Sequence, residues 1–148
     1  MKNYTEDCFH LGVKALIPNR NGKLLVLQMN PKKFKDTQKS YWDLPGGRIQ
    51  KNESLEEALK REVYEETGLQ NVIPKEFLLM TLSSKRIFLE SGDVGLIYAT
   101  YLCEAIDESP IHVSVEHVHF DWLEPKKVAN LLTSYPEALR EKINCLLL

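Results

Sequence analysis

Residues 47–69 of the chain read GRIQKNESLEEALKREVYEETGL. Five residues separate Gly47 from Glu53, and seven more separate Glu53 from the segment REVYEETGL at residues 61–69. Glycine, charged and apolar residues thus hold fixed positions over 23 residues, which is far more specific than a lone glycine motif. The pattern of residues in this stretch predicts a helix, and the placement of its acidic residues indicates a site for a divalent cation.

The two ends of this helix can be placed from the sequence. Ser54 followed by Glu57 is a capping-box pattern, which makes Ser54 the N-cap and Leu55 the first helical residue. Gly68 stands where helices commonly end in a left-handed residue, which places the last helical residue near Thr67. We therefore predict a continuous helix between these two caps.

The two faces of the predicted helix differ in chemistry, with one exception. At about 100° per residue, four apolar side chains share one face: Leu55, Ala58, Leu59 and Val63. The opposite, solvated face takes Glu56, Glu57, Lys60 and Tyr64. The exception is that Glu62 and Glu66 lie within the apolar arc and Glu65 lies on its edge. Like charges at these spacings repel, so an ordinary surface helix would not gather them.

Acidic residues on the buried-looking face need compensation, because an unpaired buried carboxylate is costly. A raised pKa with a shared proton, a nearby base or a bound cation would each provide it. Arg61 lies four residues before Glu65 and is expected to neutralise only one of the three carboxylates. Oxygen ligands suit a hard cation such as Mg²⁺ or Mn²⁺. We therefore favour a metal site over a solvated, charge-rich helix.

The segment just before the helix, residues 42–47, reads WDLPGG. Paired glycines permit positive φ and let a ligand or another backbone approach closely. A simple turn explains this segment as well as a functional loop does. Joined to the acidic helix, the segment indicates a loop that feeds a backbone carbonyl toward the metal.

Residues 47–69 resemble the Nudix box of the Nudix (MutT-like) hydrolases, with no departure from its pattern. The resemblance implies an α+β fold, namely an α/β/α sandwich with a mixed β-sheet. It implies that the carbonyl of Gly46 and the carboxylates of three helix residues ligate the metal: Glu62, Glu65 and Glu66. It also implies that Glu53 and Arg61 orient the loop and the helix carboxylates.

Glu116 lies six residues before Trp122 in the segment EHVHFDW. Several Nudix hydrolases carry a further glutamate at this point, as a metal ligand or general base, so the resemblance favours that role for Glu116. A solvated loop glutamate is the alternative. His117 and His119 have the spacing that points two side chains to one face of a strand, so a zinc pair is conceivable. Loop and strand-edge positions are the favoured interpretation of these two histidines.

Two further groups of residues near the box have open interpretations. The loop before Trp42 contains four lysines: Lys32, Lys33, Lys35 and Lys39. This loop is either simply solvated or acts as a lid whose lysines reach the substrate phosphates. Aromatic residues there could stack on a nucleobase or belong to the core: Phe34, Tyr41 and Trp42. Three arginines are equally possible phosphate partners: Arg20, Arg48 and Arg86.

Length and composition favour a compact enzyme. With 148 residues and 43% hydrophobic content, residues 1–148 are expected to form a single Nudix hydrolase domain. The net charge of −2 gives no basis for binding a nucleic-acid polymer or an anionic membrane. The first ten residues, MKNYTEDCFH, contain no apolar signal segment. Three cysteines without CxxC spacing indicate reduced thiols in a cytoplasmic protein.

Apolar runs and turn residues predict the other elements. Strands are expected at 11–17, 23–29, 76–84, 86–90, 94–104 and 118–123, with a short strand at Trp42. The first two are expected to form a hairpin through the Asn-Gly turn at 18–22. Closing helices are expected at 125–132 and 136–146, each with proline near its first position.

The resemblance implies a Mg²⁺- or Mn²⁺-dependent pyrophosphohydrolase that cleaves a nucleoside diphosphate linked to another moiety. A nucleoside triphosphate, oxidised ones included, is favoured as the substrate, giving the monophosphate and pyrophosphate. Nucleotide sugars, dinucleoside polyphosphates and a non-catalytic nucleotide-sensing role are the alternatives. Metals would lower the pKa of a bound water, and Glu66, Glu65 or Glu116 would take its proton. The expected partner is a small nucleotide, and the chain is expected to be a monomer or homodimer.

Overall fold

The computed structural model describes residues 5–33, 41–106 and 109–148. Within these residues the chain forms seven strands and three helices. The strands are β1 (Phe9–Leu16), β2 (Leu24–Met29), β3 (Trp42–Asp43), β4 (Val72–Leu82), β5 (Ile87–Leu89), β6 (Gly92–Ala105) and β7 (His117–Leu123). The helices are α1 (Leu55–Thr67), α2 (Pro125–Leu131) and α3 (Glu137–Asn144).

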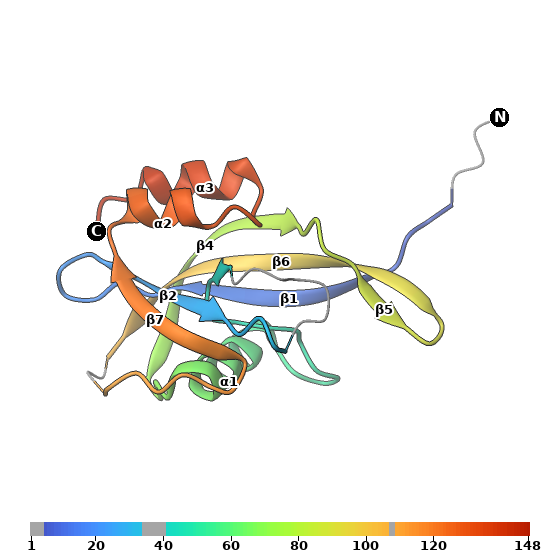
Figure 1. Ribbon diagram of the computed structural model, residues 1–148, viewed down its shortest axis with the longest axis horizontal. Helices are drawn as coiled ribbons and strands as arrows, with labels where there is room; N and C mark the ends of the chain where they lie inside the picture. Colours follow the sequence, from blue (N-terminus) through green and yellow to red (C-terminus); the bar gives the residue numbers. More distant parts are fainter. Residues whose placement is uncertain (1–4, 34–40, 107–108) are drawn as a thin grey trace.

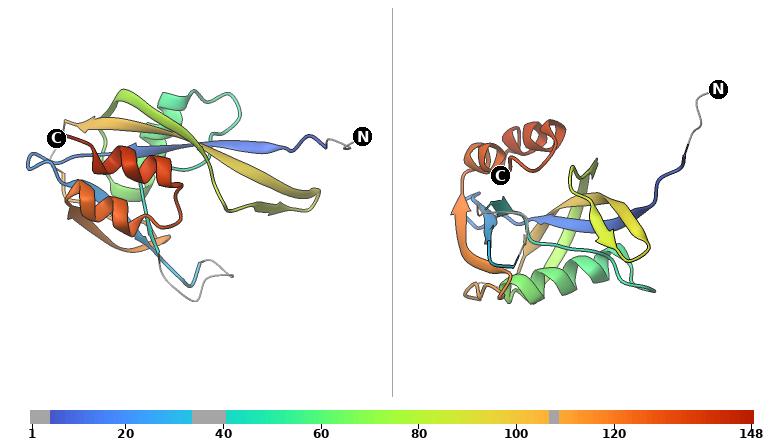
Figure 2. Two further views of the ribbon diagram at one scale, coloured as in Figure 1. Left: turned by 90° about the horizontal axis from the view of Figure 1, so that it is seen from above. Right: turned by 45° about the vertical axis from the view of Figure 1, so that its right-hand side comes forward.

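The strands form two sheets that lie between helices (Figure 1). In the first sheet β1 pairs in parallel with β6, and β6 pairs antiparallel with β4 and β5, so this sheet is mixed. The second sheet has the antiparallel order β3-β2-β7. Figures 1 and 2 show α1 on one side of the strands and α2 and α3 on the other. The predicted α+β class and α/β/α sandwich with a mixed sheet are confirmed.

The central strands are buried on both faces, because helices cover both sides of them. In β1, Val13 packs in the core that contains Leu59 of α1, whereas Leu16 packs in the core that contains Leu139 of α3. Successive side chains of a strand point to opposite faces, so β1 contributes to both cores. A strand covered on two faces is typically a near-continuous apolar run, as residues 11–17 are apart from one lysine.

Helix α1 begins and ends where the sequence predicts. The Ser54 side chain accepts a hydrogen bond from the Glu57 N–H, and the Glu57 side chain binds the Ser54 N–H in return. Gly68 closes the helix in the left-handed conformation with φ of 79°. Because both caps are formed by residues inside the stretch itself, its position does not depend on the rest of the fold.

The expected hairpin of the first two strands is wrong beyond its turn. The turn itself is formed, since the Asn19 N–H donates to the Lys23 carbonyl at 2.8 Å and Pro18 forms a bridge with Leu24. Past this bridge the two strands separate into different sheets, β1 pairing with β6 and β2 with β7. Asn-Gly specifies a turn but cannot specify which long-range partners the two strands find.

The remaining elements lie close to their predicted positions. β4 begins at Val72 rather than at residue 76, which lengthens its pairing with β6. Pro125 is at the start of α2 as expected, but Pro136 is the N-cap of α3 rather than its first residue.

Two further features of the described residues bear on the class of protein. None of their helices is both long enough and apolar enough to cross a membrane. The three cysteines, Cys8, Cys103 and Cys145, are free thiols. Burial raises the pKa of the Cys103 thiol to about 12, so this thiol stays protonated and unreactive at neutral pH.

Candidate metal and catalytic site

The glycine loop before α1 lies directly against β1. The Val13 N–H donates to the Gly47 carbonyl at 2.9 Å. A Cβ on Gly46 would lie 2.1 Å from the Val13 carbonyl oxygen, and the φ of 136° at Gly46 also favours glycine. A Cβ on Gly47 would lie 2.5 Å from the Glu62 carboxylate. Glycine is therefore required at position 46, where the loop meets the β1 backbone, whereas a side chain at position 47 would displace the Glu62 carboxylate.

Arg61 joins the loop to the helix carboxylates. Its Nε and Nη2 atoms donate to the two carboxylate oxygens of Glu53 at 2.6 and 2.9 Å. Its Nη1 atom donates to Glu62 at 2.7 Å and reaches Glu65 at 3.4 Å. These bonds lower the pKa of Glu53 to about 2. The guanidinium carries one positive charge and can neutralise only one carboxylate, although its fork contacts two carboxylates of the helix and that of Glu53.

Glu66 is the buried carboxylate of the site. Only 8% of the residue is exposed, and its Oε2 accepts a hydrogen bond from the Gly46 N–H at 2.8 Å. Its Oε1 lies 3.8 Å from Nε2 of His117. Burial raises the pKa of Glu66 to about 8. Among the described residues no lysine or arginine forms an ion pair with Glu66, so this carboxylate lacks the compensation that Glu62 receives from Arg61.

His117 lies behind Glu66 as a neutral imidazole. The residue is 5% exposed, and its Nδ1 lies 3.1 Å from the hydroxyl of Ser114. Burial lowers the pKa of His117 to about 4. His119 is instead exposed, with its ring 6.1 Å from the ring of Trp42. The two histidines therefore have different surroundings, and the contact between His117 and Glu66 was not foreseen from the sequence.

Glu116 lies on the loop before β7 with an exposed side chain. Its backbone carbonyl accepts a hydrogen bond from the Asn30 N–H at 2.8 Å, and its own N–H donates to the Ser114 hydroxyl at 3.3 Å. The loop is thus fixed, and it brings Glu116 to the same cavity as Glu65 and Glu66. Its role as ligand or base remains a prediction.

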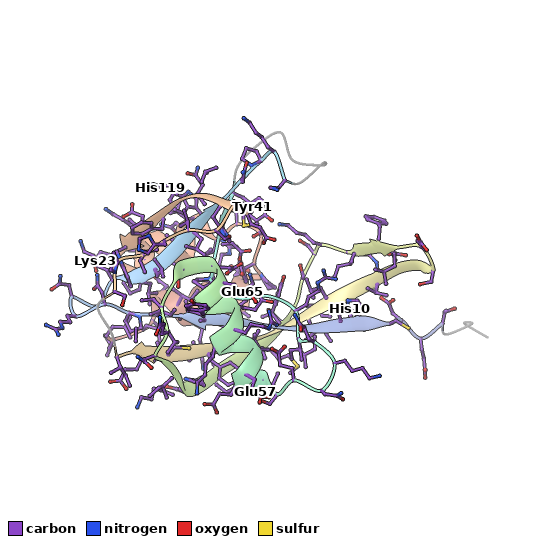
Figure 3. All side chains as sticks on the ribbon, turned by 90° about the horizontal axis from the view of Figure 1, so that it is seen from below. His10, Lys23, Tyr41, Glu57, Glu65 and His119 are labelled. Atoms are coloured by element: carbon purple, nitrogen blue, oxygen red, sulfur yellow. The ribbon has the colours of Figure 1, made fainter. Side chains whose placement is uncertain are left out.

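A cavity of about 1130 Å³ contains these groups. Figure 3 looks onto the molecule from the side of α1, with Glu57 and Glu65 labelled along that helix. Besides Lys14 and Arg61, four lysines and arginines line the cavity: Lys33, Arg48, Lys85 and Arg86. Arg86 is engaged by Asp7 at 2.8 Å, whereas the Lys85 ammonium lies 3.4 Å from the centre of the Tyr41 ring. The interpretations that concern Phe34, Lys35 and Lys39 lie outside the described residues.

The donor atoms near α1 suit a hard divalent cation in kind. All are oxygens, from the carboxylates of Glu62, Glu65 and Glu66 and from the Gly46 carbonyl. In the part of the chain that the structure describes, however, no three His, Cys, Asp or Glu side chains converge closely enough to hold an ion. Glu62 and Glu65 are turned toward Arg61 instead. A cation would therefore replace part of the Arg61 contacts when these two side chains turn toward it.

A buried polar group behind the loop was also missed. Lys14 of β1 is 3% exposed, and its ammonium pairs with Asp43 at 3.1 Å. Burial disfavours its charge, but the Asp43 carboxylate together with Tyr135, Tyr98 and Glu66 outweighs this and holds the pKa of Lys14 above its ordinary value. The sequence did contain an indication of this group, namely the lysine inside the apolar run LGVKALI. A strand that is covered on both faces leaves no solvent-exposed position for such a side chain.

Comparison with known families gives one extended match. A family model described as "NUDIX domain" matches residues 9–143, which is most of the chain. Among solved structures, the crystal structure of a MutT protein from Methanosarcina mazei Go1 superposes with a TM-score of 0.71 at 26% identity. That likeness covers 95% of this chain and 94% of the other.

Two curated relatives match over shorter segments. Nudix hydrolase 5 of Arabidopsis thaliana is 42% identical over 59 residues, which is 40% of this chain. A protein of Bacillus subtilis (strain 168), whose name provisionally assigns it 8-oxo-dGTP diphosphatase activity, is 40% identical over 65 residues, or 44% of this chain. The matched segments span only 19% and 36% of the length of these two relatives.

Proposed function

The chain belongs to the NUDIX domain family, and from that premise we propose that it is a divalent-metal-dependent hydrolase of phosphoric anhydride bonds. One observation carries the proposal. Glu66 is a nearly buried carboxylate beside the glycine loop, and burial raises its pKa to about 8 because the Lys14 ammonium and the Gly46 N–H offset only part of the charge. A bound divalent cation would provide that offset. We propose further that the chain forms one such domain and acts in the cytoplasm, in keeping with its three free thiols.

The residues around the glycine loop have different roles in the proposed reaction. Glu62, Glu65, Glu66 and the Gly46 carbonyl would hold the cation, which when bound supplies positive charge to phosphate oxygens and acidifies water. Glu53 and Arg61 fix the distance between loop and helix through their paired hydrogen bonds.

Glu65 is the favoured general base. Its side chain is 55% exposed and has one long contact, 3.4 Å, with Arg61, whereas Glu66 is engaged by the loop. The water oxygen would bond to phosphorus as the bond from phosphorus to the leaving phosphate oxygen breaks, and the water proton would pass to the carboxylate. Glu116 lines the same cavity and is the second candidate for this task.

The favoured substrate is a nucleoside triphosphate, oxidised ones included, cleaved to the monophosphate and pyrophosphate. Two observations support this choice. Lys33 and Lys85 line the same cavity as the acidic residues, and cations there suit a chain of phosphates that extends beyond the metal. The Bacillus subtilis relative is also named for activity on an oxidised nucleoside triphosphate.

A hydrolysis screen with identified products tests the proposal. The protein would be incubated with Mg²⁺ or Mn²⁺ and with nucleoside triphosphates, nucleotide sugars or dinucleoside polyphosphates, and the products separated by ion-exchange chromatography. We expect a monophosphate and pyrophosphate from a triphosphate, with none formed in EDTA or by the Glu66→Gln variant. A sugar phosphate or a second nucleotide as the main product would assign one of the other substrate classes. Nucleotide binding without any hydrolysis would identify a sensing domain instead.

A further inference from the structure

Lys14 places a fully satisfied ammonium directly under the glycine loop. Its three donors are taken by Asp43 Oδ2 at 3.1 Å, the Leu44 carbonyl at 3.0 Å and the Gly46 carbonyl at 3.1 Å. An ammonium has three N–H groups, so none remains to bind a substrate phosphate. Although Lys14 borders the cavity, its bonds are therefore directed at the loop and not at a ligand.

Asp43 is itself held from two sides. Its Oδ1 accepts a hydrogen bond from the Leu44 N–H at 2.8 Å and another from the hydroxyl of Tyr135. Tyr135 lies between α2 and α3 and is 7% exposed. The ring of Tyr98 lies 5.0 Å from the Lys14 ammonium and covers it on another side. The ion pair is thus fixed from the layer of helices opposite α1.

The bonds at Gly46 meet from both layers of the molecule. Its N–H donates to Glu66 of α1 at 2.8 Å, and its carbonyl accepts from Lys14 at 3.1 Å. Both peptide groups that flank Gly46 therefore have a fixed orientation. A carbonyl oxygen has two lone pairs, so the bond from Lys14 leaves one for a metal ion.

We propose that Lys14 is a positioning residue for the metal site, with Asp43 and Tyr135 as its supports. Its ammonium fixes the direction in which the Gly46 carbonyl points, so that the loop is ordered before a cation binds. The inference rests on the proposed function, because it gives a task to the loop that would ligate the metal. A buried ion pair adds little net stability compared with apolar residues of similar size, so stability alone is a poor explanation for this pair.

Metal affinity without nucleotide tests the proposal. Binding of Mn²⁺ would be measured by electron paramagnetic resonance for the unmutated protein, for Lys14→Met combined with Asp43→Asn, and for Tyr135→Phe. The double variant removes both charges, so neither is left buried alone. Ile143→Val is the matched control, because Ile143 packs in the same core as Tyr135 and its side chain cannot form a hydrogen bond to the loop.

We expect the double variant to bind Mn²⁺ about 10- to 100-fold more weakly, as is typical when an outer partner of a metal ligand is lost. Tyr135→Phe should weaken binding less, and it decides the question if the double variant does not fold. Ile143→Val should lower the melting temperature without changing Mn²⁺ affinity. The proposal would be overturned if the Lys14/Asp43 double variant and Tyr135→Phe both bound Mn²⁺ with an affinity within twofold of the unmutated protein.

The control Glu66→Gln separates this inference from the proposed function. If Glu66→Gln abolishes Mn²⁺ binding while the Lys14/Asp43 variant binds normally, the metal site stands and the positioning role fails. If Glu66→Gln binds Mn²⁺ as tightly as the unmutated protein, the proposed metal site itself fails. A fall in the kcat of the Lys14/Asp43 variant at constant KM, after division by the folded fraction measured by circular dichroism, would further support positioning, since a loss of folded protein alone would disappear on that division.

Discussion

Glu66→Gln removes a buried titratable carboxyl group but keeps an oxygen that can accept a hydrogen bond from the Gly46 N–H. In the metal-free protein, burial raises the pKa of Glu66 from 4.5 to about 8. Between these two pH values the folded protein keeps the proton, whereas the unfolded chain has released it. Because the folded state binds more protons in this window, its free energy of unfolding falls as the pH rises.

The magnitude follows from the width of that window. At about 1.4 kcal/mol for each pH unit, the loss from pH 4.5 to 8 approaches roughly 5 kcal/mol. Glu66→Gln has no proton to release, so it should escape this loss and become the more stable protein near pH 8. Urea unfolding in EDTA at pH 5, 6, 7 and 8 would measure the free energy of unfolding of both proteins. Subtracting one value from the other at each pH removes the contribution of all other titrating groups.

Added metal should narrow the difference in stability between the two proteins near pH 8. At free Mg²⁺ or Mn²⁺ near 100 times the dissociation constant, the unmutated protein should gain about 2.7 kcal/mol, and the variant should gain less. Parallel curves of stability against pH in EDTA would refute the argument that Glu66 is buried without an adequate cation. A melting temperature unmoved by millimolar metal would refute the metal site.

Three further changes test individual residues. Glu65→Gln should lower kcat by a factor on the order of 10² to 10⁴, whereas Glu56→Gln on the solvated face should leave it unchanged, as steady-state kinetics would show. If Glu116 is the base, Glu116→Gln should lower kcat with little change in KM and shift the acidic limb of the pH profile; a loss confined to His117→Ala would move that role to the imidazole. Arg61→Lys should lower both metal affinity and kcat, since one ammonium cannot span the carboxylates that the guanidinium joins.

Helix α1 was predictable because its determinants are local. The capping box at Ser54 and the left-handed Gly68 lie within a few residues of the ends that they set. The amphipathic pattern also placed Glu66 on the buried side, since this depends only on the angle between successive residues. These statements need no knowledge of what packs against the helix.

Pairing between distant residues could not be read from the sequence. Asn-Gly at the first turn is compatible with a hairpin, yet β1 joins β6 and β2 joins β7, more than eighty residues along the chain. The contact between His117 and Glu66 likewise depends on where β7 comes to lie beside α1. The spacing of residues along a strand or helix indicates which side chains share a face. It does not indicate which other element that face packs against.

Arg61 shows how the same carboxylates can serve a stable fold and a metal site. In the structure its guanidinium donates to Glu62, lies 3.4 Å from Glu65 and binds Glu53 through two bonds. A cation that took Glu62 and Glu65 would leave Arg61 its two bonds to Glu53, so the loop would remain attached to the helix. Glu66 forms no ion pair with a lysine or arginine among the described residues, and it accepts a hydrogen bond from the Gly46 N–H at 2.8 Å. Glu66 is therefore the helix carboxylate whose ionisation most needs a further cation, and this is why its substitution should distinguish most sharply between a metal site and an acidic helix.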